Sequence, residues 1–279
     1  MSVLEQFQKR KDFLICIDSD GCAIDSMNIK HVQCFGPCMV REWELEGWEE
    51  AILERWNKIN LYSKTRGINR FLALAETLKE ADQNFIRIQG IREFSEWCGQ
   101  TDELSNQSVE KKYQDCGQQV FQKALHWSKA VNKAIAGLNE EQICPFDGAP
   151  EGIRKAYQNA DVAIVSSANE EAVKREWNRY GLMDSVDICL TQSEGSKAYC
   201  IGKMMEKGYA RDRVLMIGDA PGDRLAAEEN GVLYYPILVR REAESWHRFI
   251  GEALPYFLKG IYQGRYEEER KQEFEENLS

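Results

Sequence analysis

The chain has 279 residues, which is enough for one large or two modest domains. Of these residues, 43% are hydrophobic and 29% are charged, which is the composition of a globular protein. Its net charge of -10 lacks the basic excess of a nucleic-acid-binding surface, so we expect no nucleic acid partner. Nine cysteines without paired spacing favour a reducing compartment, and no apolar run approaches the roughly 18 residues of a membrane span. We therefore expect a cytoplasmic protein with no membrane partner.

The first predicted strand carries two acidic residues at its end. Residues 13–17 are a continuous apolar run, too short for an amphipathic helix, and predict a buried strand. Asp18 and Asp20 follow, and Gly21 permits a sharp turn. Open α/β sheets build their sites at the carboxyl ends of strands. Because two adjacent carboxylates repel each other unless a cation or a shared proton intervenes, this pair predicts a divalent metal.

A long helical stretch follows this strand. From residue 26 to 143 the sequence shows helical periodicity with charged faces and no run of the buried-strand type. Helices are predicted over residues 49–61, 68–81, 91–98 and 109–137. Five of the seven tryptophans fall in this stretch, which is typical of a helical module with its own core. Residues 144–148, CPFDG, predict a linker that ends it.

Strands and helices then alternate along the chain. Strands are predicted over residues 162–165, 186–190, 214–217 and 232–235. Helices are predicted over residues 150–158, 170–180, 197–207 and 223–230. Repeated βα units predict a parallel sheet with helices on both faces.

These patterns predict an α/β fold, a Rossmann-like, doubly wound parallel sheet with an inserted all-helical cap domain. The sheet domain is expected to comprise residues 1–25 and 144–240, because the first strand precedes the helical stretch. The cap is expected to comprise residues 26–143. Residues 241–279 predict a helical tail whose acidic end, from Glu267 to Glu276, is expected to be solvated.

Polar residues also follow the later strands of the sheet domain: Ser166, Lys197, Asp219 and Asp223. In a doubly wound sheet these residues converge with the first two acids at one edge. Carboxylate oxygens suit Mg²⁺, which keeps several waters and leaves room for a substrate phosphate. Ser166 is suited to donating a hydrogen bond to a phosphoryl oxygen, and Lys197 to neutralising its charge.

Four segments together resemble the haloacid dehalogenase-like superfamily, in the branch with a helical cap between its first and second motifs. They are DSDGC with its following DS, the serine after VAIV, Lys197, and GDAPGD. The cap matches only in position and helical character. The resemblance implies a Mg²⁺-dependent phosphatase that hydrolyses a small phosphorylated metabolite through an aspartyl-phosphate. Cys22 departs from the pattern, since many members carry threonine there, and Lys203 is a nearby alternative to Lys197.

The resemblance also implies roles for the matching residues. Asp18 is the implied nucleophile, and Asp20 is the implied acid that protonates the leaving oxygen and then activates water. Ser166 and Lys197 are implied to hold the transferring phosphoryl group. The implied metal ligands are the carboxylate of Asp18, the backbone carbonyl of Asp20, Asp219, and Asp223 directly or through water. Relatives that cleave carbon–halogen bonds generally lack an acid at the position of Asp20, so its presence favours phosphate esters.

Two other functions remain open from the sequence. A phosphomutase of the sugar-phosphate type would use the same two aspartates, and a non-catalytic scaffold would bind phosphorylated ligands without turnover. A dinucleotide-binding domain is disfavoured, because DSDGCA lacks the required Gly-x-Gly spacing.

Two further groups of residues in the cap have side chains that could form a site. Arg66, Asn69 and Arg70 are candidates for holding a substrate anion, although a surface loop that caps the next helix is the favoured interpretation. His31, Cys34 and Cys38 lack a fourth ligand for zinc, and core packing or a turn around Gly36 and Pro37 is favoured there.

Overall fold

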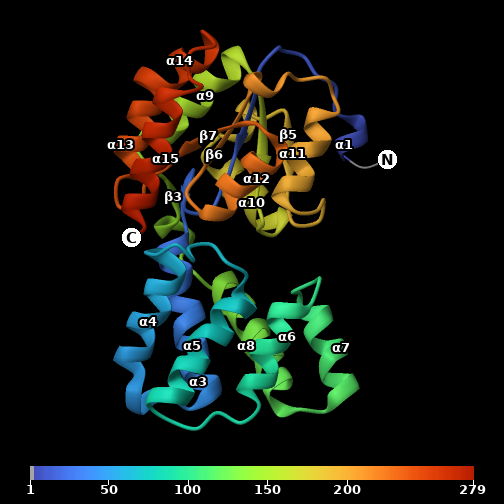
Figure 1. Ribbon diagram of the computed structural model, residues 1–279, viewed down its shortest axis with the longest axis vertical. Helices are drawn as coiled ribbons and strands as arrows, with labels where there is room; N and C mark the ends of the chain where they lie inside the picture. Colours follow the sequence, from blue (N-terminus) through green and yellow to red (C-terminus); the bar gives the residue numbers. More distant parts are fainter. Residues whose placement is uncertain (1–2) are drawn as a thin grey trace. The chain divides into compact units, whose positions relative to one another are not determined.

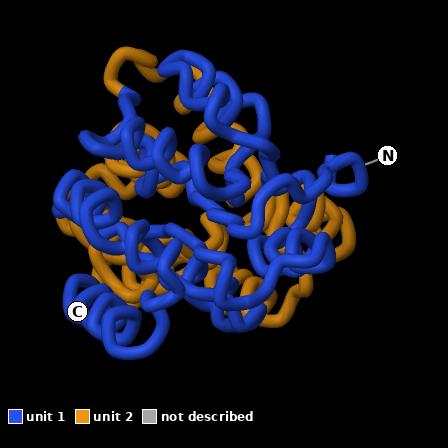
Figure 2. The backbone as a smooth tube through the Cα atoms, turned by 90° about the horizontal axis from the view of Figure 1, so that it is seen from above, with its two compact units in different colours: residues 1–26, 143–279 blue, residues 27–142 orange. Residues whose placement is uncertain are grey.

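The computed structural model describes residues 3–279, so residues 1 and 2 of the predicted sheet domain lie outside the described residues. The chain divides into two compact units. One unit contains residues 3–26 and 143–279, and the other contains residues 27–142 (Figure 2). The second unit is continuous in sequence, whereas the first is assembled from both ends of the chain.

The first unit is built on a five-stranded parallel sheet with the order β5-β4-β1-β6-β7. The strands are β1 (Leu14–Ile17), β4 (Asp161–Val165), β5 (Ile188–Leu190), β6 (Val214–Gly218) and β7 (Leu233–Pro236). The central strand β1 is buried along its whole length, as a sheet covered on both faces requires. After β1 the chain adds strands on one side and then returns to add β6 and β7 on the other. The switch point, where such sheets form their sites, lies between β1 and β6.

Helices cover both faces of this sheet, which confirms the predicted doubly wound α/β fold. Figure 1 shows α9, α13 and α14 on one side of the sheet and α11 and α12 on the other. The helices are α1 (Val3–Gln6), α9 (Ala149–Asn159), α10 (Glu170–Arg179), α11 (Lys197–Met205), α12 (Pro221–Asn230), α13 (Glu242–Arg248), α14 (Leu254–Leu258) and α15 (Arg265–Asn277). The predicted helices and strands of this part lie within a few residues of the observed ones.

A short antiparallel ribbon forms where the chain leaves and re-enters the first unit. Its strands are β2 (Ile24–Asp25) and β3 (Cys144–Pro145), and the Phe146 amide also donates to the Ala23 carbonyl at 3.1 Å. The predicted linker therefore includes a paired strand rather than only a loop.

The second unit is all-helical. Its helices are α2 (Met27–Lys30), α3 (Gly36–Trp43), α4 (Glu49–Leu61), α5 (Arg70–Asn84), α6 (Ile91–Gln100), α7 (Asn106–Cys116) and α8 (Gln119–Ala136). They pack around the fully buried rings of Trp56 and Trp127, whose centroids are 5.9 Å apart and nearly perpendicular. Edge-to-face contacts of this kind favour one arrangement of the aromatic core. Among residues 3–279, no helix is long and apolar enough to cross a membrane.

One prediction for the helical unit is wrong, and one of two alternatives considered for it is not observed. The single helix over residues 109–137 is two helices, because Gly117 adopts a φ of 67° and ends α7 in the left-handed conformation. The chain at Gly36 and Pro37 stays helical, because a π-helix over His31–Phe35 runs directly into α3 and the Gly36 amide donates to the His31 carbonyl. The favoured core packing of Cys34 and Cys38 is confirmed, since both side chains are buried.

The expectation of a solvated carboxyl-terminal end is correct for one face only: Glu268, Glu269, Glu275 and Glu276 are exposed, whereas the opposite face is buried. Helix α15 packs against strand β7, and Phe274 and Leu278 are each 2% exposed. The Phe274 ring meets the Tyr234 ring edge-to-face at a centroid distance of 5.7 Å. The tail therefore belongs to the core of the first unit.

Replacing Phe274 by alanine tests this packing. We expect Phe274→Ala to lower the free energy of unfolding by about 3 kcal/mol, because it leaves a cavity beside the sheet. Leu225→Ala, at a side chain that is 55% exposed, is the control and should change it by less than about 0.5 kcal/mol. Urea denaturation measures the free energy of unfolding of both variants. If Phe274→Ala lowers it no more than Leu225→Ala does, the tail is not part of the core.

Candidate active site

Asp18 occupies the first position after the central strand. Its amide donates to the Ile217 carbonyl of β6 at 3.0 Å, so the ladder between β1 and β6 continues to this residue. The chain then turns back at Gly21, whose φ of 82° favours glycine, and the Ile24 amide donates to the Ser19 carbonyl at 2.9 Å. This tight loop fixes the direction in which Asp18 leaves the strand.

Two tryptophans distant in the sequence hold this loop. The indole N–H of Trp177 donates to Ser19 Oγ at 2.9 Å, and that of Trp246 donates to the Cys22 carbonyl at 2.9 Å. The Cys22 thiol is buried and lies 3.6 Å from the Ile217 carbonyl as a weak donor. The sequence prediction missed both tryptophans, because nothing in their spacing marks them as loop contacts.

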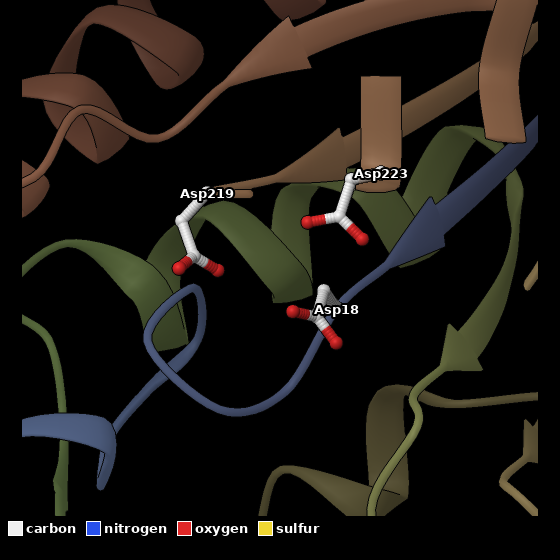
Figure 3. Close-up of side chains that lie close together, drawn as sticks. All are labelled: Asp18, Asp219 and Asp223. Carbon is white, nitrogen blue, oxygen red and sulfur yellow. The ribbon is translucent and has the colours of Figure 1, made fainter. Parts of the chain in front are cut away.

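Three carboxylates meet at the switch point of the sheet. Asp219 follows β6, Asp223 lies in the first turn of α12, and both are fully buried. One carboxylate oxygen from each of these two residues and one from Asp18 all lie within 4.8 Å of one another (Figure 3). Gly218 makes this possible, since a Cβ at that position would overlap the Asp223 carboxyl group. The structure thus brings together three of the four predicted acids.

Lys197 provides a positive charge within the cluster. Its Nζ lies 2.8 Å from Asp18 Oδ1 and 2.5 Å from Asp223 Oδ1. Burial lowers the pKa of this ammonium, but the two carboxylates outweigh burial and raise the pKa above its usual value. Lys197 therefore stays charged, whereas the alternative Lys203 pairs with the exposed Glu206 at 2.7 Å.

The charges of these four side chains do not balance. If all three carboxyl groups are ionised, one ammonium leaves two negative charges uncompensated. Burial, and then the neighbouring Asp223 and Asp219, raise the pKa of Asp18 well above its usual range despite the opposing effect of Lys197. A divalent cation would remove this excess, and an all-oxygen donor set suits a hard ion such as Mg²⁺.

The oxygens of Asp223 are already engaged by protein donors. Oδ1 accepts from Lys197, and Oδ2 accepts from the Ala220 amide at 3.0 Å. Asp18 and Asp219 are therefore better suited to direct coordination, and Asp223 to orienting Lys197 or a metal-bound water.

The other two predicted catalytic-core residues lie at strand ends outside the carboxylate cluster. Asp20 is partly buried, and its Oδ1 accepts from the Ser26 hydroxyl at 2.7 Å. Ser166 follows β4 and is 4% exposed, and its Oγ accepts from the Ala168 amide at 3.1 Å. That contact leaves the hydroxyl proton of Ser166 available for donation.

The three cap candidates make contacts inside the helical unit. The Arg66 guanidinium is buried and donates to the Leu61 carbonyl at 2.8 Å. Asn69 caps α5 by accepting from the Phe71 amide at 2.9 Å. Arg70 lies over the Phe35 ring and donates to two polar side chains of this unit, Ser128 at 3.1 Å and Asn132 at 2.8 Å.

Comparison with known proteins shows the same architecture. A structure of a haloacid dehalogenase-like family hydrolase from Streptococcus pneumoniae matches 88% of this chain and 98% of its own, with 14% identity and a TM-score of 0.50. A candidate phosphoglycolate phosphatase from Lactobacillus delbrueckii subsp. bulgaricus matches 91% and 100%, with 15% identity and a TM-score of 0.54. These likenesses show a shared fold. No curated protein matches the sequence.

A family model gives the more specific result. The model described as haloacid dehalogenase-like hydrolase matches residues 68–235, which is more than half of the chain. The match begins after Asp18 and Asp20, so the placement of these two residues rests on the geometry described above. On this match, together with the parallel sheet and its acidic cluster, the chain belongs to the haloacid dehalogenase-like hydrolase family.

Proposed function

We propose that this hydrolase is a Mg²⁺-dependent phosphatase that cleaves a small organic phosphate monoester through an aspartyl-phosphate. The observation that carries this proposal is the buried cluster of Asp18, Asp219 and Asp223 with Lys197 at the switch point of the sheet. Its excess negative charge calls for a divalent cation, and a dianionic phosphoryl group needs both that cation and an ammonium to approach a carboxylate.

In this proposal Asp18 and Asp219 would hold the metal, with the Asp20 backbone carbonyl as a further ligand and Asp223 in support. The bound metal would neutralise charge on the phosphoryl oxygens. Lys197, 2.8 Å from Asp18 Oδ1, would act with the bound cation to favour the ionised form of the nucleophile, and would contact the same phosphoryl group. Ser166 would donate its hydroxyl proton to another phosphoryl oxygen.

Two chemical steps follow from these positions. An Asp18 oxygen attacks phosphorus, and the bond from phosphorus to the leaving oxygen breaks as Asp20 supplies that oxygen with a proton. Asp20 then takes a proton from water, which attacks phosphorus and releases phosphate and free Asp18. Asp20 suits this exchange because it is less buried than the other acids and is held by Ser26 rather than by the carboxylate cluster.

We propose only the general class of the substrate, a small phosphate ester with an oxygen leaving group. An acid at position 20 supports an oxygen leaving group, because an alkoxide needs a proton as it leaves. A role in holding a substrate anion remains a prediction for Arg66, Asn69 and Arg70. Each of these side chains already makes a hydrogen bond within the helical unit. We also propose a cytoplasmic location, since all nine cysteines are free thiols.

Phosphate release tests the proposal directly. We expect p-nitrophenyl phosphate and a panel of phosphorylated metabolites to be hydrolysed with Mg²⁺ and not with EDTA. Asp18→Asn should lower the rate by about a thousandfold or more, because it removes the nucleophile. A folded protein that binds Mg²⁺ but releases no phosphate would contradict a phosphatase. Isomerised sugar phosphate in the same assays would identify a mutase.

Gly218 gives a second prediction. Gly218→Ala should lower the hydrolysis rate by about a hundredfold, because the new methyl group displaces Asp223 and with it Lys197. Gly222→Ala is the matched control, since a Cβ at that position meets nothing within 4 Å. The control should retain the wild-type rate, and equal rates in both variants would show that the contact between Gly218 and Asp223 does not matter.

A further inference from the structure

The carboxyl-terminal segment makes three contacts with one residue of the edge strand β7, Tyr234. The Tyr262 hydroxyl donates to the Tyr234 carbonyl at 2.6 Å, and the Tyr234 amide donates to Glu267 Oε1 at 3.3 Å. Phe274 packs edge-to-face on the Tyr234 ring. Backbone groups on the open side of an edge strand would otherwise lack partners within the sheet, so the tail replaces a missing neighbouring strand at this position.

The side chain of the same residue reaches toward the acidic cluster. The Tyr234 hydroxyl donates to the Gly218 carbonyl at 3.0 Å, and the Ile237 amide donates to the same oxygen at 2.9 Å. This carbonyl belongs to the peptide group that joins Gly218 to Asp219. Burial, and then the nearby Asp223 and Asp219, raise the pKa of Tyr234, so its hydroxyl keeps the proton that it donates.

We propose that Tyr234, held by the carboxyl-terminal segment, is a positioning residue that fixes Asp219 for metal binding. Repulsion among three buried carboxylates pushes them apart, and the backbone that carries Asp219 must resist this force. Two donors on the Gly218 carbonyl oxygen restrict rotation of the peptide group that precedes the Cα atom of Asp219, and so restrict the direction of its side chain. The inference rests on the proposed function, because it assigns Asp219 to the metal site.

The test compares two variants that each lose one phenolic hydroxyl group, Tyr234→Phe and Tyr209→Phe. Tyr209 is also a buried tyrosine, but its hydroxyl donates to Asp161 at the amino end of β4, the edge of the sheet opposite the site. Both variants should unfold at lower urea concentration. Calorimetric titration with Mg²⁺ alone should show roughly tenfold weaker binding for Tyr234→Phe and unchanged binding for Tyr209→Phe.

The contribution of the tail is tested by Tyr262→Phe, which removes the hydrogen bond to the Tyr234 carbonyl without touching the site. We expect it to weaken Mg²⁺ binding about threefold, in the same direction as Tyr234→Phe. Amide hydrogen exchange of residues 218–223 in metal-free protein provides a second readout. Exchange there should be faster in Tyr234→Phe and Tyr262→Phe than in Tyr209→Phe.

The possible outcomes separate this inference from the proposed function. Wild-type Mg²⁺ affinity and wild-type exchange in Tyr234→Phe, with its stability lowered as in Tyr209→Phe, would overturn the inference and leave the phosphatase proposal standing. A wild-type protein that binds no Mg²⁺ would contradict the metal site itself, and the inference with it. Weaker binding confined to the Tyr234 and Tyr262 variants would support a positioning role.

Discussion

The repulsion among three buried carboxylates at the carboxyl ends of β1 and β6 is the constraint on which the rest of the structure depends. Asp18, Asp219 and Asp223 are buried together, and Lys197 neutralises only part of their charge. Such a cluster is unfavourable in the folded protein without a cation. It is therefore better explained by chemistry at this position than by a contribution to stability.

The topology of the sheet brings these carboxylates together, and contacts from other parts of the first unit hold the loops that carry them. Ile17 of β1 pairs with Ile217 of β6, so Asp18 and Asp219 leave adjacent parallel strands almost side by side. The supporting contacts come from helices and strands far away in sequence. Trp177 and Trp246 hold the loop after β1, and Tyr234 holds the peptide before Asp219. Trp246 belongs to the carboxyl-terminal segment, and the same segment holds Tyr234 through Tyr262 and Glu267.

The strands and their ends could be predicted from the sequence, because each strand is a short apolar run. The meeting of Asp18, Lys197, Asp219 and Asp223 could then be predicted, because the carboxyl ends of parallel strands lie at one edge of the sheet. The sequence did not reveal that Gly117 divides a periodic helix, since isolated glycines also occur within helices. The packing of α15 was missed because only one face of that charged helix, marked by Phe274, is buried. The indole contacts of Trp177 and Trp246 depend on tertiary structure alone, which no spacing along the chain encodes.

The most direct test of this account is to identify the residue that carries phosphate during turnover. Protein quenched in acid during hydrolysis of p-nitrophenyl phosphate with Mg²⁺, reduced with borohydride and digested, would be analysed by peptide mass spectrometry. Borohydride reduces an aspartyl-phosphate to homoserine, and the account predicts this conversion at Asp18. Conversion at another acidic residue, or none during measurable turnover, would contradict the assignment of Asp18 as the nucleophile.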